Sequence, residues 1–128
     1  MAGENDISRI VVDRAIKVHS ALGPGLLESA YEACLAFELD RAGLGVKRQV
    51  VLPLLYESIQ IEAGFRVDLL IEDKVVLEVK AVEKIHPVHL TQLLTYLRLG
   101  GYKLGFVLNF HCLRMKDGIK RVVSGLEG

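Results

Sequence analysis

The segment GFRVDLLIEDKVVLEVKA, residues 64–81, constrains the fold of this chain more than any other stretch. Two apolar runs of strand length flank the polar tripeptide EDK, a pattern that predicts two antiparallel strands joined by a tight turn. Three charged residues, Asp68, Glu78 and Lys80, stand inside these runs. Burying a charge in such strands costs several kcal/mol unless the charge is paired or binds a metal ion. The segment therefore predicts a buried hairpin whose charges need a partner.

The register of this hairpin decides whether the three charges meet. Glu78 and Lys80 are two residues apart, so on a strand their side chains point to the same face. If the loop is residues 72–74, Asp68 lies opposite Glu78 and shares that face, whereas a two-residue loop would turn Asp68 to the other face. We expect the three-residue loop, and with it a cluster of Asp68, Glu78 and Lys80.

Two interpretations of this cluster stay open on spacing alone. The carboxylates of Asp68 and Glu78 would repel each other across neighbouring strands, and a divalent cation would remove that repulsion. Magnesium prefers hard oxygen ligands, often one or two carboxylates together with waters and a substrate phosphate. The alternative is a structural ion pair between Lys80 and either carboxylate on an exposed sheet face. Only the first interpretation predicts that the protein binds a divalent metal ion.

Hydrophobic periodicity extends the prediction over the rest of the chain. The predicted elements are a helix over residues 6–20, a helix over residues 26–42, a strand over residues 46–52 that extends to residue 56, strands over residues 60–71 and 74–81, a helix over residues 86–101, a strand over residues 103–110, and a last hairpin over residues 113–123 that turns at Asp117-Gly118. In the first strand, Val46, Arg48, Val50 and Leu52 alternate with polar or outward residues.

This order predicts an α/β fold of the α+β type with a mixed sheet. Three consecutive strands favour an antiparallel meander, and the strand–helix–strand step from residue 75 to about residue 109 favours a right-handed parallel crossover. With 128 residues the chain is long enough for one well-buried core and too short for two, so a single domain over residues 1–128 is expected.

Composition places the chain among ordinary globular proteins, with 51% hydrophobic and 25% charged residues. No apolar run approaches the roughly 20 residues that span a bilayer, so no membrane association is expected. The start of the chain, MAGENDISRI, is polar, which argues against a signal peptide. Cys34 and Cys112 stand in apolar surroundings without metal-ligand spacing, so we expect two buried thiols in a reducing compartment. Together these features predict a cytoplasmic protein.

The net charge restricts how the chain could meet nucleic acid. Sixteen basic and 16 acidic residues give a formal net charge of zero, which argues against a stand-alone DNA binder of high affinity. It does not exclude an enzyme with a metal site beside a local basic patch. The residues that could contact phosphate are Lys47, Arg48, Arg66, Lys84, Arg114, Lys116, Lys120 and Arg121, although scattered surface charges are the commoner explanation of such residues.

Two helical positions add polar groups near the predicted cluster. Gln92 and Tyr96 are four residues apart and share one face of the helix that follows the hairpin. Glu28 lies in the first turn of the second helix, where interaction with the helix dipole alone would explain it. Tyr31, one turn later, is by default a core aromatic residue.

These residues together resemble a known signature. Asp68, the tripeptide EVK at residues 78–80, and QLLTY at residues 92–96 resemble the PD-(D/E)XK nuclease signature in its RecB-like form with the trailing QxxxY motif. The segment GLLESAY, residues 25–31, is similar to the motif of the GxxExxY protein family within that superfamily. The resemblance spans nearly the whole chain and implies a restriction-endonuclease-like core. No proline precedes Asp68, where Val67 stands instead, but the superfamily is lax at that position.

The resemblance also implies roles for the individual residues. Asp68 and Glu78 would hold one or two Mg²⁺ ions, with Mn²⁺ as a substitute, helped by the main-chain carbonyl of Val79 and by the carboxylate of Glu28. Lys80 would orient the attacking water and stabilise charge on the phosphate. Gln92 and Tyr96 would orient the lysine, the water or the nucleic-acid backbone. The four histidines, His19, His86, His89 and His111, are not expected to belong to the site.

Three functional hypotheses follow, in order of preference. The first is a metal-dependent nuclease that hydrolyses phosphodiester bonds in nucleic acid, with DNA as the favoured substrate and an arrangement as a homodimer plausible for an enzyme that must meet two strands. The second is a catalytically silent module of the same fold that binds nucleic acid or a protein partner. The third is a structural domain whose charges form an ion-pair cluster and bind no metal.

Overall fold

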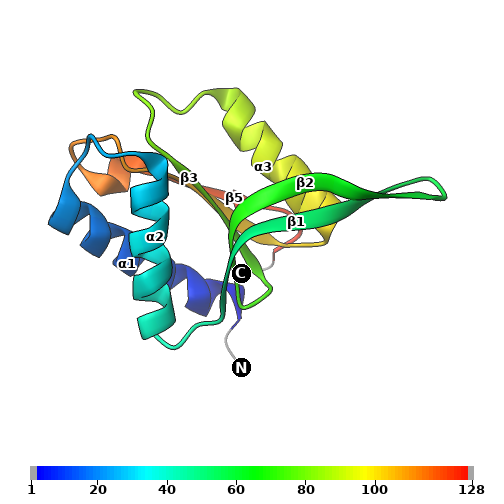
Figure 1. The fold of residues 1–128 in the computed structure, drawn as a ribbon, viewed down its shortest axis with the longest axis horizontal. Coiled ribbons are helices and arrows are strands. Elements are labelled where there is room, and N and C mark those ends of the chain that lie inside the picture. The colour runs from blue at the N-terminus through cyan, green and yellow to red at the C-terminus, as the bar shows by residue number, and fades with distance from the viewer. Residues whose placement is uncertain (1–2, 127–128) are drawn as a thin grey trace.

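The computed structural model describes residues 3–126, apart from the side chain of Ala63. A single domain is expected over residues 1–128, and residues 1–2 and 127–128 of it lie outside the described residues. The elements follow one another in the predicted order (Figure 1). They are α1 (Glu4–Leu22), α2 (Glu28–Arg41), β1 (Val46–Tyr56), β2 (Ile59–Ile71), β3 (Val75–Lys80), α3 (Pro87–Gly100), β4 (Leu104–Asn109), the short 3-10 helix η1 (Met115–Gly118) and β5 (Ile119–Val123).

The strands form one five-stranded mixed sheet in the order β1-β2-β3-β4-β5. The first three strands are an antiparallel meander, β4 runs parallel to β3, and β5 is antiparallel to β4. The predicted mixed sheet, meander and parallel step across α3 are therefore confirmed. In the hairpin of β2 and β3, Ile71 pairs with Val75, so the loop is residues 72–74, as the sequence predicts.

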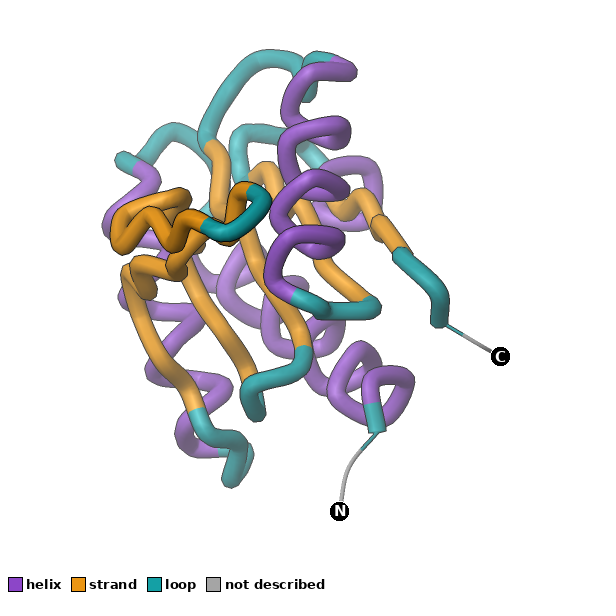
Figure 2. The backbone as a smooth tube through the Cα atoms, turned by 90° about the vertical axis from the view of Figure 1, so that its right-hand side faces the viewer, coloured by secondary structure: helices purple, strands orange, loops and turns teal. Residues whose placement is uncertain are grey.

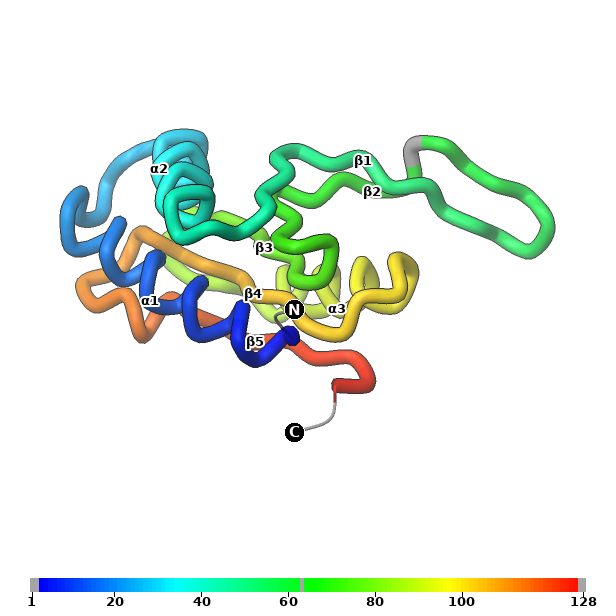
Figure 3. Tube along the Cα trace, turned by 90° about the horizontal axis from the view of Figure 1, so that it is seen from below, coloured from blue at the N-terminus to red at the C-terminus, as the bar shows by residue number. Residues whose placement is uncertain are grey.

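Helices cover both faces of the sheet (Figures 2 and 3). One face, which includes Leu77 and Phe106, packs against the apolar sides of α1 and α2. The opposite face, which includes Val76 and Val107, packs against Leu93 of α3. Consecutive residues of β3 thus enter different cores, which explains the continuous apolar run that this strand shows in the sequence. The two cores fix β3 and β4 at the centre of the molecule.

The first two strands of the meander, β1 and β2, exchange faces part-way along their length. In β2, Val67 packs in the core against α3, whereas Leu69 packs in the core against α1 and α2. In β1, Val46 packs toward α1 and α2, whereas Val50 packs toward α3. Residues two apart share a face in a regular strand, so the alternation predicted for β1 does not continue through the whole strand. The switch falls at Gln49 of β1 and at the residue that faces it, Asp68.

Past Leu52 of β1 and Phe65 of β2, which still pack toward α3, the two strands continue as a two-stranded arm that projects from the rest of the molecule (Figure 1). The register shifts between Leu52 and Leu54, around Pro53. Close packing there explains Gly64, because a Cβ atom at this position would lie 2.3 Å from the Cβ atom of Leu54. The arm turns at Glu57 and Ser58, where the sequence predicts a turn.

The end of the chain differs from its prediction. Instead of a hairpin turning at Asp117-Gly118, these residues belong to η1, and the partner of β5 is β4. Asp117 donates its backbone N–H to the carbonyl of Arg114 (3.0 Å), which closes the 3-10 turn. The glycine is required for packing rather than for a reverse turn, because a Cβ atom on Gly118 would lie 2.1 Å from the carbonyl oxygen of Asn109.

Several side chains also differ from their expected surroundings. Cys34 and Cys112 are free thiols, and both are half-buried rather than buried. His19 is buried near the end of α1, and its Nε2 atom contacts the carbonyl of Cys112 (2.7 Å). Tyr31 is a core aromatic, as expected, and its hydroxyl donates to the carbonyl of Gly23 (2.6 Å).

Within residues 3–126 no helix has the length and hydropathy to span a membrane.

Candidate active site

The predicted site residues gather where β2 and β3 separate. The last paired residues of these strands are Leu69 and Leu77. At the next position the backbone N–H of Val79 donates to Oδ2 of Asp68 (2.8 Å). The Asp68 side chain therefore takes the place of a backbone acceptor and brings its carboxylate to Glu78, as the three-residue loop predicts. The place where the pairing of β2 and β3 ends, with Asp68 and Glu78 beside it, is called the notch below.

Glu78 is the most perturbed group of the notch. The pKa of its carboxyl is raised from 4.5 to about 9, by burial first and by the neighbouring charge of Asp68 second, while Lys80 opposes the shift. In the described part of the chain, Oε1 of Glu78 is buried and has no hydrogen-bond partner. A buried oxygen without a partner is costly. An oxygen atom that binds a metal ion would show the same lack of a protein partner.

The donor set of the notch fits a divalent cation. Asp68 and Glu78 supply two carboxylates, and the carbonyl of Val79 points toward β2 because the N–H and C=O of one strand residue point to the same side. Two carboxylates with a carbonyl, completed by waters, are the kind of ligands that Mg²⁺ accepts. Among residues 3–126, however, no group of three or more His, Cys, Asp or Glu side chains is arranged to hold a metal. The pair of Asp68 and Glu78 is thus the centre of the site.

Lys80 and Glu28 lie at the end of β3, next to this pair. Lys80 is half-buried on the same face as Glu78. Glu28, the first residue of α2, is exposed and accepts the N–H of Ala81 through Oε2 (3.3 Å). His89 is close as well: burial lowers the pKa of its imidazole, and the charge of Lys80 lowers it further. Glu28 is thus attached to the residue that follows Lys80, a position called the rim of the notch below.

Asn109 at the end of β4 fixes this end of β3. Its Oδ1 atom accepts the N–H of Val82 (3.0 Å) and its Nδ2 atom donates to the Val82 carbonyl (2.8 Å). The adjacent Phe110 donates its N–H to the carbonyl of Lys80 (2.9 Å). Asn109 is almost fully buried. The backbone on both sides of Lys80 is therefore held to β4.

Gln92 and Tyr96 share one face of α3, as predicted, and are hydrogen-bonded to each other. The amide nitrogen of Gln92 donates to the Tyr96 hydroxyl (2.8 Å). The Tyr96 ring stacks on Phe65, with 4.8 Å between ring centroids. Burial raises the pKa of the Tyr96 phenol above its ordinary value, and the charges of Glu78 and Asp68 raise it further. The phenol therefore lies within electrostatic reach of both carboxylates and stays protonated at neutral pH.

The comparison with known proteins agrees with this geometry. A family model of the PD-(D/E)XK nuclease superfamily matches residues 5–122. The chain belongs to the PD-(D/E)XK nuclease superfamily. The matched region contains the separating strands and the helix that follows them, so the nuclease fold predicted from the sequence is confirmed. No curated protein matches the chain, and no solved structure does.

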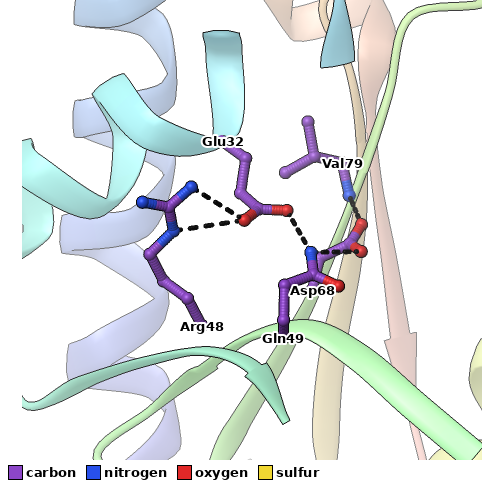
Figure 4. Close-up of polar contacts among 5 residues, drawn as sticks. All are labelled: Glu32, Arg48, Gln49, Asp68 and Val79. Carbon is purple, nitrogen blue, oxygen red and sulfur yellow. Dashed lines mark hydrogen bonds and ion pairs between the residues drawn. The ribbon is translucent and has the colours of Figure 1, made fainter. Parts of the chain in front are cut away.

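Three polar residues beside the superfamily motif belong to the candidate site but are not among the residues that the sequence predicts for it (Figure 4). Glu32 of α2 is buried, and its Oε2 atom is bound by Nη2 (3.1 Å) and Nε (3.2 Å) of Arg48. Gln49 donates through Nε2 both to Oε1 of Glu32 (2.6 Å) and to Oδ1 of Asp68 (3.3 Å). Glu32 could have been noticed, since it follows Glu28 by four residues on one helix face. Nothing in the sequence marks Gln49.

Several of the basic residues that could contact phosphate are engaged elsewhere. Arg48 is paired with Glu32 as described, and Lys47 is paired with Asp73 (2.7 Å). Arg114 lies 3.6 Å from the carboxylate of Asp117. These ion pairs reduce the local positive charge available to nucleic acid. Arg66 acts on a residue beside the notch, because its charge opposes the rise in the pKa of Tyr96.

An apolar pocket lies elsewhere in the nuclease-like fold and contains none of the predicted site residues. Its volume is about 290 Å³, and it lies between α1 and α2, where Val18, Cys34 and Phe37 line it. The ion pair of Lys17 and Glu38 (3.0 Å) lies at its edge. The candidate active site is the notch between β2 and β3.

Proposed function

We propose that this member of the PD-(D/E)XK superfamily is a metal-dependent nuclease that hydrolyses phosphodiester bonds, with DNA as its substrate. The observation that carries the proposal is the pair of carboxylates of Asp68 and Glu78. They share one notch, and Oε1 of Glu78 is buried there without a hydrogen-bond partner. Lys80 follows on the same strand face. A carboxylate pair that is unfavourable by itself becomes favourable when a divalent cation lies between the two groups.

Mg²⁺, with Mn²⁺ as a substitute, is the proposed cofactor. Asp68, Glu78 and the Val79 carbonyl would hold it, and Glu28 would contribute from the rim. When bound, a divalent cation supplies charge stabilisation at the scissile phosphate and makes water a better nucleophile at neutral pH. The four proposed ligand groups are all oxygen donors, which suits a hard cation.

Lys80 and Tyr96 are the proposed proton and charge partners. The Lys80 ammonium would orient the attacking water and offset negative charge that builds up on the phosphate. Because Gln92 donates to the Tyr96 oxygen, the phenol proton of Tyr96 is left free to donate outward. Gln92 and Tyr96 would thus position a phosphate oxygen of the nucleic-acid backbone next to the carboxylates.

A second candidate function is a catalytically silent module that binds nucleic acid or a protein partner. Two observations favour it. The formal net charge is zero, and Lys47, Arg48 and Arg114 form ion pairs with acidic residues. Both reduce the electrostatic attraction on which nucleic-acid affinity depends. This candidate predicts metal binding without cleavage. We further propose a cytoplasmic protein, and a homodimer where two strands must be cut.

The deciding experiment is cleavage of labelled duplex DNA, single-stranded DNA and RNA in Mg²⁺ or Mn²⁺, with Lys80→Ala purified identically. We expect the wild type to cleave DNA and the variant to lose at least about 100-fold in rate, as removal of an electrostatic catalytic group does. Equal activity of both preparations would contradict the proposed site. Metal binding by the wild type with no cleavage of any substrate would favour the silent module.

A further inference from the structure

Gln49 has an unusual backbone conformation for the middle of a strand. Its φ angle is +50°, in the left-handed region that few residues other than Gly adopt. The pairing of β1 with β2 is regular on both sides of it but omits the pair of Gln49 and Asp68. A conformation of this kind persists only where the surrounding structure enforces it, and such residues cluster at functional sites.

The left-handed turn changes where the Gln49 side chain points. Arg48 and Gln49 are consecutive, so in a regular strand they would point to opposite faces of the sheet. In this structure both side chains reach Glu32 of α2 (Figure 4). An ion pair of Arg48 with Glu32 needs no irregular backbone. The irregularity therefore serves Gln49, and its effect is to place the amide between two carboxylates.

The chemistry of the neighbours fixes the orientation of this amide. Nε2 of Gln49 lies 2.6 Å from Oε1 of Glu32 and 3.3 Å from Oδ1 of Asp68. Both neighbours accept hydrogen bonds and neither donates when ionised, so the NH₂ group must face them and supplies one hydrogen to each. Arg48 pairs with Oε2 of Glu32 through two nitrogen atoms, which holds that carboxylate in place as an anchor.

The two oxygens of Asp68 are consequently held by different parts of the fold. Oδ1 accepts from Gln49, and Oδ2 accepts from the N–H of Val79. Each oxygen retains a further lone pair. The carboxylate plane is thus oriented by β1 on one side and β3 on the other, and its free lone pairs remain available to a cation in the notch.

We propose that Gln49 is a positioning residue for the metal-binding carboxylate of Asp68, anchored in turn by the Glu32–Arg48 ion pair. This inference rests on the proposed function in so far as a divalent cation occupies the notch. Partners that orient a ligand are worth about 10- to 100-fold in metal affinity in known metal sites. Gln49 would act from the side of β1, a strand that contributes no residue of the superfamily motif.

The test uses Gln49→Asn in the full-length protein. Asn keeps the amide and tolerates the left-handed backbone, but it is one methylene shorter and cannot bridge Glu32 and Asp68. The matched control is Gln60→Asn, because Gln60 is an exposed amide on the arm that contacts Glu62. Gln49→Gly is a second variant, since Gly adopts this φ angle without strain and removes the amide entirely.

Two readouts are independent of cleavage. In Mn²⁺ titrations by calorimetry, we expect Gln49→Asn and Gln49→Gly to bind at least tenfold more weakly than the wild type, and Gln60→Asn to bind equally well. In metal-free protein, amide hydrogen exchange of Val79 should become faster in both Gln49 variants, because a loosened Asp68 protects that N–H less. Melting temperatures of all variants measured in parallel separate this local effect from global destabilisation.

The outcomes for Gln49 and for the nuclease activity are distinguishable. If Mn²⁺ affinity and Val79 exchange are the same in the wild type and both Gln49 variants, the positioning role is wrong, whether or not the protein cleaves DNA. If the wild type binds Mn²⁺ and the Gln49 variants bind it more weakly, but no nucleic acid is cleaved, the positioning role stands and the proposed nuclease fails. A wild type that binds no Mn²⁺ overturns both.

Discussion

Replacing Glu78 by Gln should stabilise the metal-free protein, by an amount that grows with pH. The pKa of Glu78 in the folded protein is raised from 4.5 to about 9, by burial first and by Asp68 second. An acid with a raised pKa binds its proton more tightly in the folded state, so its contribution to stability is fully present below about pH 4.5 and is lost as the pH rises toward 9. Gln carries no titrating proton and avoids this loss.

The pKa shift sets the upper limit of the effect. Three pH units separate 4.5 from about pH 7.5, and at about 1.4 kcal/mol for each unit the wild type loses at most about 4 kcal/mol over that interval. Glu78 is not fully buried and Lys80 lies near it, so we expect a smaller difference, about 1–2 kcal/mol between Glu78→Gln and wild type at pH 7.5. Near pH 4.5 the two proteins should differ little.

Urea unfolding in EDTA between about pH 5 and pH 9 measures this difference directly. Glu83→Gln is the matched control, because Glu83 is exposed and lies close to the same strand end. Wild type and Glu83→Gln should lose stability together as the pH rises, and Glu78→Gln should lose less. If the stability of wild type and Glu78→Gln changed with pH in parallel, the raised pKa assigned to Glu78 would be wrong.

Divalent metal should reverse the order of stability. A bound ion adds RT ln(1 + [L]/Kd), which is about 2.7 kcal/mol at 100 times Kd. Wild type gains this term in Mn²⁺, whereas Glu78→Gln has lost a charged ligand and gains less. Asp68→Ala is a less direct probe, because it also leaves the Val79 N–H without its acceptor. A structural ion-pair cluster, the alternative interpretation, predicts no response to metal in any variant.

Two further predictions concern the packing around the end of β3. Asn109→Leu should lower the free energy of unfolding by about 2 kcal/mol, because it leaves the part-buried backbone groups of Val82 without their partner. It should also slow cleavage by displacing Lys80. Unfolding curves and initial rates check the two effects, and unchanged stability would contradict the assigned hydrogen bonds. Gly118→Ala should be destabilising by at least about 2 kcal/mol, since the added Cβ would meet the Asn109 carbonyl at 2.1 Å. Gly125→Ala offers a comparison in thermal unfolding, because a Cβ atom at that position has no neighbour within 4 Å and only its φ angle of +73° resists the change.

Local patterns in the sequence determined most of the fold and the meeting of the two carboxylates in the candidate site. The order of helices and strands follows from helical and alternating periodicity, which depends on neighbours a few residues apart. The meeting of Asp68 with Glu78 follows from one loop length and the two-residue period of a strand, and the pairing of Ile71 with Val75 bears it out. Gln92 and Tyr96 needed only helical spacing.

Tertiary structure alone decided the support of that site and the end of the chain. Gln49 is hydrogen-bonded to Glu32, 17 positions before it, and to Asp68, 19 positions after it. It does so from a left-handed backbone conformation within a strand, which the sequence does not predict for a glutamine. The raised pKa of Glu78 comes from burial among elements distant in sequence. Asp117-Gly118 has the composition of a hairpin turn, yet the approach of the Asn109 carbonyl leaves room there only for glycine. Short-range periodicity cannot carry such information, because each of these features depends on which distant backbone or carboxylate comes close after folding.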